Sequence, residues 1–233
     1  MQQFFDFPVT PVSSLDNFIV CEGTAAAHAF AMRIADPADP DTLLYLYGPH
    51  GSGKTHLLKA LAAHLLSSAP LEPYISCREP DRLRVIADRA CMLPLLVVDD
   101  LDLLPDDASI RGALWQAFNE FYASGRPVVM AGLLPPRELP TLDDHLVSRL
   151  LWGLVARLDV SDDSSRRMII KKIAEDKQIL VPDELLDYIL ATSGREAGEL
   201  ISAFEQLYRC SMSTKRKMTL ALARECLAAG GQR

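Results

Sequence analysis

The sequence predicts an α/β fold, a three-layer sandwich around a parallel sheet, followed by a small α-helical subdomain. Five short apolar runs, rich in aliphatic and β-branched residues, are separated by stretches of helix length; they lie at 43–48, 73–77, 95–100, 128–132 and 154–160. Continuous apolar strands of this kind are typical of a parallel sheet covered on both faces. No strand pattern follows Val160, so we expect an α/β domain at 13–160 and a helical subdomain at 161–233.

Helices are predicted by apolar residues at helical spacing between and after these strands. The stretches 55–68 and 110–124 each carry such an apolar stripe. After the last strand, four segments have the same character, and they span 161–178, 182–193, 195–210 and 218–229. The first of them opens with polar residues suited to capping and an acidic first turn, as helices commonly do.

Composition limits the functions that the chain can have. Its net charge of −7 argues against a broad nucleic-acid-binding surface. No apolar run approaches the roughly 18 residues needed to span a membrane, and the first residues lack the pattern of a signal peptide. We therefore expect a cytoplasmic protein that does not bind membranes.

The five cysteines are odd in number, scattered and never arranged as a CxxC pair. This distribution indicates neither a disulfide framework nor a zinc site. We expect all five to be reduced and most of them to be buried.

The chemistry is predicted by GPHGSGKT at 48–55, which stands between the first strand and its helix. It satisfies the pattern G-x-x-x-x-G-K-[ST], in which backbone amides at a helix N-terminus surround a phosphate chain. The predicted nucleotide contacts along it are Gly48, Pro49, His50, Gly51, Ser52, Gly53, Lys54, Thr55 and the adjoining His56. In such a loop Lys54 reaches the β and γ phosphates, and the Thr55 hydroxyl is a ligand of Mg²⁺.

A phosphate loop needs an acidic partner at the end of a neighbouring strand, and LLVVDD at 95–100 supplies one. We expect Asp99 to hold the Mg²⁺ shell together with Thr55. Asp100 is predicted to orient or deprotonate the attacking water. The pair is interpreted as a Walker B motif.

The order of several motifs resembles the AAA+ domain of the bacterial initiator DnaA. These motifs are LDNFIVCEG, GPHGSGKTHLL, LLVVDDLDLL, HLVSRLLWGL and MTLALARECL, and the likeness covers nearly all of 15–228. The resemblance implies a P-loop AAA+ fold, a helical lid and ATP or ADP with Mg²⁺ as cofactors. We expect neither the N-terminal interaction domain of DnaA nor its DNA-binding domain, and hence no direct sequence-specific DNA binding. The 17 residues from Arg78 to Pro94 are too few for the additional helix with which DnaA engages single-stranded origin DNA.

In length and outline the chain is similar to the Hda family of DnaA-related regulators. In that family a short N-terminal peptide of outline Q-L-x-L-P binds the replicative sliding clamp, and the AAA+ module stimulates ATP hydrolysis by DnaA. Residues 1–12 resemble that peptide through Gln3, Phe5, Phe7 and Pro8, although Gln3 stands one residue too far away. The alternative is that these phenylalanines pack back on the domain. The resemblance thus implies a negative regulator of replication initiation whose partners are DnaA and the clamp.

The same resemblance assigns two further groups of residues. Arg149, in the sequence SRL, falls where the family has an arginine finger, which acts in trans on nucleotide held by an adjacent subunit. Phe18, Ile19 and Val20 correspond to the stretch lining the adenine pocket. The alternative interpretations are a surface ion pair for Arg149 and ordinary core packing for the apolar three.

Two departures from the family pattern concern residues that read the γ phosphate. Leu133 replaces a polar sensor after the fourth strand, and Gly198 stands where the second sensor arginine is expected. Arg195 lies one helical turn away and is a candidate substitute. We therefore hypothesise that the protein binds adenine nucleotide but hydrolyses it slowly by itself.

Two other functions share these motifs. One is a helicase loader of the DnaC type or a transposition helper ATPase, and the other is a nucleotide-dependent scaffold without catalytic role. The resemblance also leaves open a homo-oligomer assembled through the AAA+ interface. An intact phosphate loop is compatible with each of these, because it defines the class of ligand and little more.

Overall fold

A computed structural model describes residues 13–39, 41–66, 73–89 and 92–228 of the chain. The chain divides into two compact units. One comprises residues 13–161 with 196–198, and the other holds residues 162–195 together with the described residues from 199 onwards. Among the described residues, no helix is both long and apolar enough to cross a membrane.

The first unit is built on a five-stranded sheet in which every pairing between neighbours is parallel. The strands are β1 (Leu43–Tyr47), β2 (Tyr74–Ser76), β3 (Leu96–Asp99), β4 (Val128–Gly132) and β5 (Leu154–Arg157). Their spatial order is β2-β3-β4-β1-β5, which places β1 between β4 and β5. The three central strands are buried almost throughout, which explains their continuous apolar sequences.

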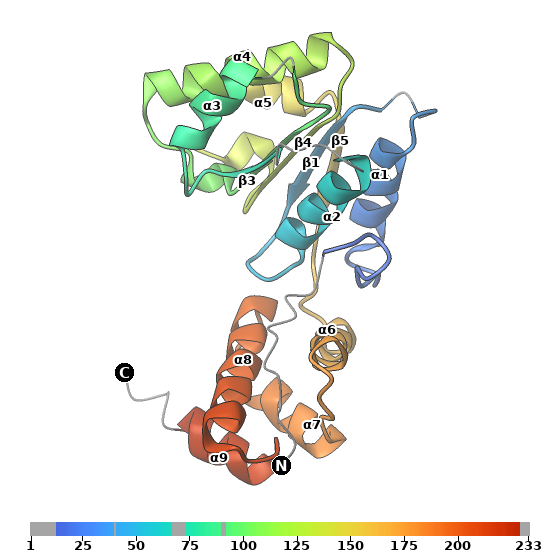
Figure 1. Ribbon diagram of the computed structural model, residues 1–233, viewed down its shortest axis with the longest axis vertical. Coiled ribbons are helices and arrows are strands. Elements are labelled where there is room, and N and C mark those ends of the chain that lie inside the picture. Colours follow the sequence, from blue (N-terminus) through green and yellow to red (C-terminus); the bar gives the residue numbers. More distant parts are fainter. Residues whose placement is uncertain (1–12, 40, 67–72, 90–91, 229–233) are drawn as a thin grey trace, which may run out of the picture. The chain divides into compact units, whose positions relative to one another are not determined.

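Helices cover both faces of this sheet (Figure 1). One face is covered by α1 (Ala25–Ala35) and α2 (Lys54–Leu66), and the other by α3 (Asp81–Arg89), α4 (Ala108–Ala123) and α5 (Asp144–Leu150). Two short 3-10 turns follow the third and fourth strands, at Leu101–Leu103 and Pro136–Glu138. Each face has its own hydrophobic core, so the unit is a three-layer sandwich.

Helix boundaries follow from identifiable capping groups. The carboxylate of Asp107 accepts hydrogen bonds from the amides of Ser109 and Ile110, so α4 begins directly after it. These bonds hold the pKa of Asp107 below its usual value. Asp162 caps the following unit's first helix in the same way, through the amide of Ser165.

The second unit consists of helices in the described residues. They are α6 (Asp163–Asp176), α7 (Asp183–Thr192), α8 (Ala197–Thr214) and α9 (Leu220–Ala228). Their apolar faces enclose a separate core in which Ile170, Ile189, Phe204 and Leu222 are among the buried residues. The predicted fold class is therefore confirmed, with five parallel strands and a helical region after them. The short helix α5 was not singled out by apolar spacing, because only seven residues form it.

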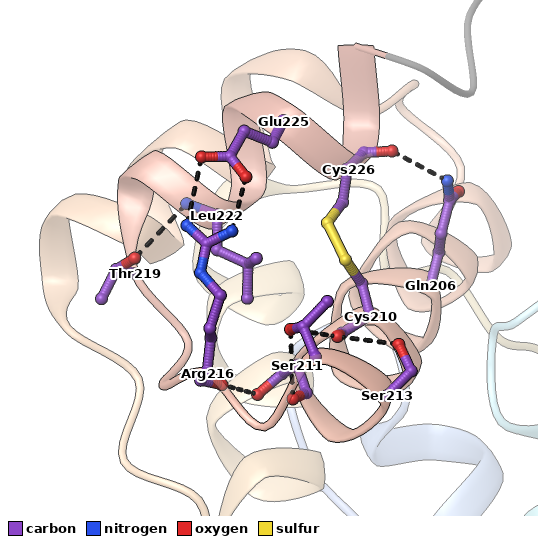
Figure 2. Close-up of a disulfide and its surroundings, with 10 residues drawn as sticks. Gln206, Cys210, Ser211, Ser213, Arg216, Thr219, Leu222, Glu225 and Cys226 are labelled. Carbon is purple, nitrogen blue, oxygen red and sulfur yellow. Dashed lines mark hydrogen bonds and ion pairs between the residues drawn. A yellow bond between two sulfur atoms is a disulfide. The ribbon is translucent and has the colours of Figure 1, made fainter.

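The expectation that every cysteine is a free thiol is wrong. Cys210 and Cys226 form a disulfide between α8 and α9, and Figure 2 shows it together with the surrounding polar contacts. Their Cα atoms lie 6.7 Å apart although the residues are 16 positions apart in sequence. Sequence spacing could not reveal the pair, because the packing of the two helices brings the side chains together. Nearby, Arg216 forms an ion pair with Glu225 through two hydrogen bonds.

Replacing Cys226 by serine should destabilise the helical unit by about 2–4 kcal/mol in the absence of reductant, because a cross-link closing a loop of this size restricts the unfolded chain. Denaturant unfolding followed by circular dichroism measures this difference. The variant and the wild type should become equally stable once both are reduced. Counting thiols in the denatured, unreduced protein is the control: five cysteines with one pair leave three free thiols, whereas a count of five would contradict the pairing.

Candidate functional site

The segment from Gly48 to Gly53 connects β1 to α2 and wraps around the N-terminus of that helix. Two of its glycines are required by close backbone approach. A Cβ at Gly48 would lie 2.1 Å from the carbonyl oxygen of Leu158. Gly53 has a φ of +99°, and a Cβ there would lie 3.1 Å from the ring of Phe18. The loop can adopt this path only with glycine at both positions.

Lys54 is the first residue of α2, and only 9% of it is exposed. Its ammonium group donates to the carbonyl oxygens of Gly48, at 2.6 Å, and Pro49, at 2.8 Å. Burial lowers the pKa of Lys54, and the nearby Asp99 partly opposes that shift. A desolvated cation inside a loop of amides is a favourable environment for an anion such as phosphate.

Ser52 adds an independent indication that the loop fits a ligand. Its hydroxyl oxygen is buried and has no hydrogen-bond partner among the described residues. The first amides of α2 have no acceptor within the helix, because the first four amides of any α-helix lack one. Buried polar groups without partners are uncommon in native proteins. The unpartnered Ser52 hydroxyl and the buried Lys54 ammonium at the start of α2 together fit a phosphate chain.

The acidic side of the site lies where β3 ends. Asp99 is 1% exposed and accepts hydrogen bonds from the hydroxyls of Thr55, at 2.6 Å, and Tyr74, at 3.0 Å. Burial and the adjacent carboxylate raise the pKa of the Tyr74 phenol, so it remains a donor at neutral pH. The structure thus brings together Thr55 and Asp99, the two predicted metal ligands. Hydroxyl and carboxylate oxygens are ligands that Mg²⁺ accepts alongside phosphate oxygens.

Asp100 follows in the left-handed region, with a φ of +57°, and its side chain turns to other partners. Its carboxylate accepts from the Ser76 hydroxyl at 2.6 Å and from the Arg78 guanidinium at 3.1 and 3.4 Å. Both donors come from the end of β2 and the turn after it. The predicted catalytic carboxylate is therefore engaged by two neighbouring side chains in this structure.

Of the three predicted adenine contacts, one lies at the loop. The ring of Phe18 adjoins Gly53 and contacts the rings of His28 and His56, at centroid distances of 5.8 and 5.6 Å. The carbonyl of Ile19 accepts from the Thr24 hydroxyl. The side chain of Val20 is about half exposed, at 49%. The ring of Phe18 thus lies beside the start of α2, and the adenine-binding role of all three residues stays a prediction.

Arg149 lies in the last turn of α5. Its guanidinium lies 4.4 Å from the centre of the Trp152 ring and 5.7 Å from that of Tyr122. In the described part of the chain no carboxylate lies within ion-pair distance of it. The surface ion pair considered as its alternative role is therefore not formed among the described residues. The side chain of Arg149 is half-buried.

The two departures at the sensor positions can be located. The side chain of Leu133 contributes no polar group, and only its backbone amide is engaged, donating to Asp102 at 3.1 Å. Arg195 is exposed and belongs to the helical unit, and Gly198 has no side chain. The predicted clamp contacts Gln3, Phe5, Phe7 and Pro8 lie outside the described residues.

Sequence reasoning missed Tyr74, Ser76 and Arg78. For Ser76 a signal was present, because it ends a strand and residues at the carboxyl ends of neighbouring parallel strands converge at one edge of the sheet. Tyr74 begins the same strand, and its contact with Asp99 depends on the pairing of β2 with β3. No local pattern indicates that Arg78 folds back onto Asp100.

The strand order, the loop before α2 and the aspartates at the end of β3 define the α/β fold of P-loop AAA+ ATPase domains. The family model described as "Bacterial DnaA ATPase domain" matches residues 10–157, and the model described as "Hda, lid domain" matches residues 163–227. The chain belongs to the family of bacterial DnaA ATPase domains.

Individual relatives agree with this assignment. The chromosomal replication initiator protein DnaA of Thermoanaerobacter sp. (strain X514) is 27% identical over 232 residues; the match covers 94% of this chain and 52% of that protein. The chain therefore spans about half the length of that curated relative. The crystal structure of domain III of Thermotoga maritima DnaA is 26% identical with a TM-score of 0.82, covering 96% of this chain and 98% of that one.

A more distant structure shares the fold. It is AMPPCP-bound DnaA from Aquifex aeolicus, at 22% identity and a TM-score of 0.73, covering 88% of this chain and 67% of that one. That DnaA was thus observed with a non-hydrolysable ATP analogue. The family matches and these relatives together make this chain a DnaA-related AAA+ protein.

Proposed function

We propose that the protein binds ATP or ADP with Mg²⁺ at the loop 48–55 and acts as a negative regulator of replication initiation that stimulates ATP hydrolysis by DnaA. Lys54 and the loop amides would hold the phosphates, and Thr55 with Asp99 would hold the metal ion. A metal ion bound there would neutralise charge on the phosphates. The related DnaA that was crystallised with AMPPCP supports the choice of an adenine nucleotide.

The observation that carries the regulatory role is the combination of two family matches in one chain. A DnaA ATPase domain is followed here by a lid that matches the model of the Hda lid domain. The Hda lid is the lid of the DnaA-related regulators to which this chain is similar. This pairing favours a partner of DnaA over an initiator.

Arg149 is the group proposed to act on the partner. An arginine finger stabilises charge that develops on the transferred phosphoryl group, and it must bring unoccupied N–H donors to that charge. No hydrogen bond or ion pair engages the Arg149 guanidinium within the described ranges. Its donors are therefore available to a nucleotide held by an adjacent subunit.

Slow hydrolysis by the protein alone is supported by the other half of the site. Asp100 would have to orient water, yet its oxygens accept from Ser76 and Arg78. Leu133 offers no polar side chain to the γ phosphate. The nucleotide would then serve mainly to stabilise the form of this protein that binds DnaA.

Tethering to the sliding clamp is proposed from the sequence outline of Gln3, Phe5, Phe7 and Pro8. An extended segment ending in proline suits docking of large apolar side chains into a pocket on a partner. Deleting residues 1–8 should abolish binding to the clamp and leave the thermal midpoint unchanged. A lower midpoint with binding intact would instead indicate that the phenylalanines pack on the domain.

The deciding experiment measures the rate at which DnaA loses bound ATP, with and without this protein, on DNA that carries the clamp. We expect a faster loss only when both this protein and the clamp are present. If the protein instead promoted loading of a helicase or activity of a transposase, the helper-ATPase function would replace the proposed one. Binding to DnaA without any change in the rate of ATP loss would indicate a nucleotide-dependent scaffold without a catalytic role.

The contacts around Asp100 make a separate prediction. Replacing Arg78 by alanine should raise the protein's own slow ATP hydrolysis by about two- to five-fold, the size of effect expected from an exposed ion pair. The physical reason is that removal of the guanidinium frees one carboxylate oxygen of Asp100 for water and leaves the other with the Ser76 hydroxyl as its donor. Single-turnover hydrolysis under excess protein measures the change, and Arg82→Ala, which removes another surface arginine from the adjoining helix α3, is the matched control. A rate that is unchanged or lower in the Arg78 variant would mean that the pair does not restrain Asp100.

A further inference from the structure

Trp152 is a large apolar side chain that the fold does not bury. It is 62% exposed and stands just after the last residue of α5. Its backbone amide donates to the carbonyl of Arg149 at 3.0 Å, so the turn fixes the two residues relative to each other. A single exposed apolar side chain is common in proteins, so the contacts of Trp152, not its exposure, are what matter here.

Three rings connect Arg149 to the core of the first unit. Phe118 on α4 is fully buried, and Tyr122, one turn later, stacks on it at a centroid distance of 5.7 Å. Trp152 packs against Tyr122 in a tilted arrangement at 6.4 Å. The buried ring of Phe118 thus holds Tyr122, and Tyr122 holds Trp152. The guanidinium of Arg149 lies over the rings of both Tyr122 and Trp152.

The type of contact matters because it leaves the donors of Arg149 free. A cation–π contact with an aromatic ring does not use up the five N–H groups of a guanidinium as an ion pair would, and none of those of Arg149 is hydrogen-bonded among the described residues. An ion pair would restrain the side chain equally well, but it would occupy the groups that a phosphoryl oxygen needs.

Another arginine of the same unit shows the contrast. Arg126 lies over the ring of Phe121 at 4.2 Å, and its N–H groups also donate to the carbonyl of Leu93 and the carboxylate of Glu120. The N–H donors of Arg126 are therefore used in contacts that stabilise the fold. The side chain of Arg149 has only the two aromatic contacts in the parts of the chain that the structure describes.

We propose that Trp152 and Tyr122 are positioning residues that restrain the Arg149 guanidinium while its N–H donors stay available for nucleotide bound to a partner subunit. The inference rests on the proposed function, in which Arg149 acts on DnaA. A free arginine side chain samples many rotamers, and restraining it before the partner arrives reduces the entropy lost in the transition state.

The test compares Trp152→Leu with Trp152→Phe in the assay of ATP loss from DnaA on clamp-loaded DNA. Leucine removes the ring and should lower the maximal stimulated rate by about two- to five-fold, the size expected from one exposed cation–π contact. Phenylalanine keeps an aromatic face and should restore most of the rate. The concentration of protein giving half-maximal stimulation should not change, because Trp152 acts through Arg149.

Leu151→Ala is the matched control, since it removes an exposed apolar side chain from the same turn and Leu151 has no ring to offer Arg149. It should leave the stimulated rate unchanged. An equal loss in Leu151→Ala and Trp152→Leu, or a raised half-maximal concentration with an unchanged maximal rate, would show that this turn docks the partner and would overturn the proposal.

Two further measurements separate this inference from the function on which it rests. In an Arg149→Ala background, Trp152→Leu should cause no additional loss, because the residue through which it acts is gone. Without any partner, the ¹⁵N order parameter of the Arg149 Nε–H group should fall below about 0.6 in Trp152→Leu, the range of flexible groups. If the wild type fails to stimulate DnaA, the proposed function falls. An order parameter that stays the same in the variant would overturn the positioning role whether or not DnaA is stimulated.

Discussion

Replacing Arg149 by alanine should lower the stimulated rate of ATP loss from DnaA by about 10³-fold or more, which would bring it close to the rate without this protein. The reason is that the finger supplies positive charge and N–H donors to the transferred phosphoryl group, and in this chain those donors are not engaged by any described residue. The rate is measured with DnaA preloaded with labelled ATP on clamp-loaded DNA.

The variant should fold normally, because among the described residues the side chain of Arg149 is engaged only by the rings of Trp152 and Tyr122, neither of which is fully buried. Equal thermal midpoints for wild type and variant, and equal retention on clamp-loaded DNA, are the controls. Arg149→Lys keeps the positive charge but loses the planar set of donors, so we expect it to restore only a small part of the rate. Full stimulation by Arg149→Ala would exclude Arg149 as the finger.

Replacing Lys54 by alanine should weaken ATP binding by about 10- to 150-fold, the range expected when a hydrogen bond to a charged group is lost. In the structure this buried ammonium donates to the carbonyls of Gly48 and Pro49 within the loop. Phosphate oxygens are stronger partners for it than neutral carbonyls, since both groups would then be charged. Isothermal calorimetry with ATP and Mg²⁺ measures the change in affinity.

Thermal unfolding provides a second measurement of the same prediction. A ligand at 100 times its dissociation constant stabilises the folded state by about 2.7 kcal/mol, so wild type should show a clear rise in midpoint with ATP. The rise should largely disappear in Lys54→Ala. Lys59→Ala, which removes an exposed lysine of the same helix, should retain it. If Lys54→Ala kept the full rise, the nucleotide would have to bind elsewhere.

Much of the fold could be predicted because its signals are local. An apolar run such as 95–100 is buried on both sides by helices, so its composition alone indicates a central parallel strand. The predicted strand 128–132 agrees with β4 residue for residue. Helix ends were less predictable. The apolar spacing predicted that the helix α8 ends at residue 210, but the helix continues to Thr214. Its last turn lacks the apolar spacing on which the prediction depended.

The phosphate loop was predictable for a similar reason. Its spacing of glycines and Lys54 is a local requirement of one turn between a strand and a helix, and the turn is built as expected. Asp99 could be placed near Thr55 because the strand that carries it is buried and parallel to its neighbours. Their roles in binding nucleotide and metal stay predictions.

The amino-acid sequence by itself determined the fold class, the phosphate loop and the position of the strand-end aspartates, because each depends on residues close together in the chain. Only the tertiary structure decided which partners the chemically important side chains have. It pairs Cys210 with Cys226, engages Asp100 with Arg78, and lays Arg149 on Trp152 and Tyr122. These contacts depend on strand order and helix packing, which bring together residues on separate elements and which no local spacing encodes.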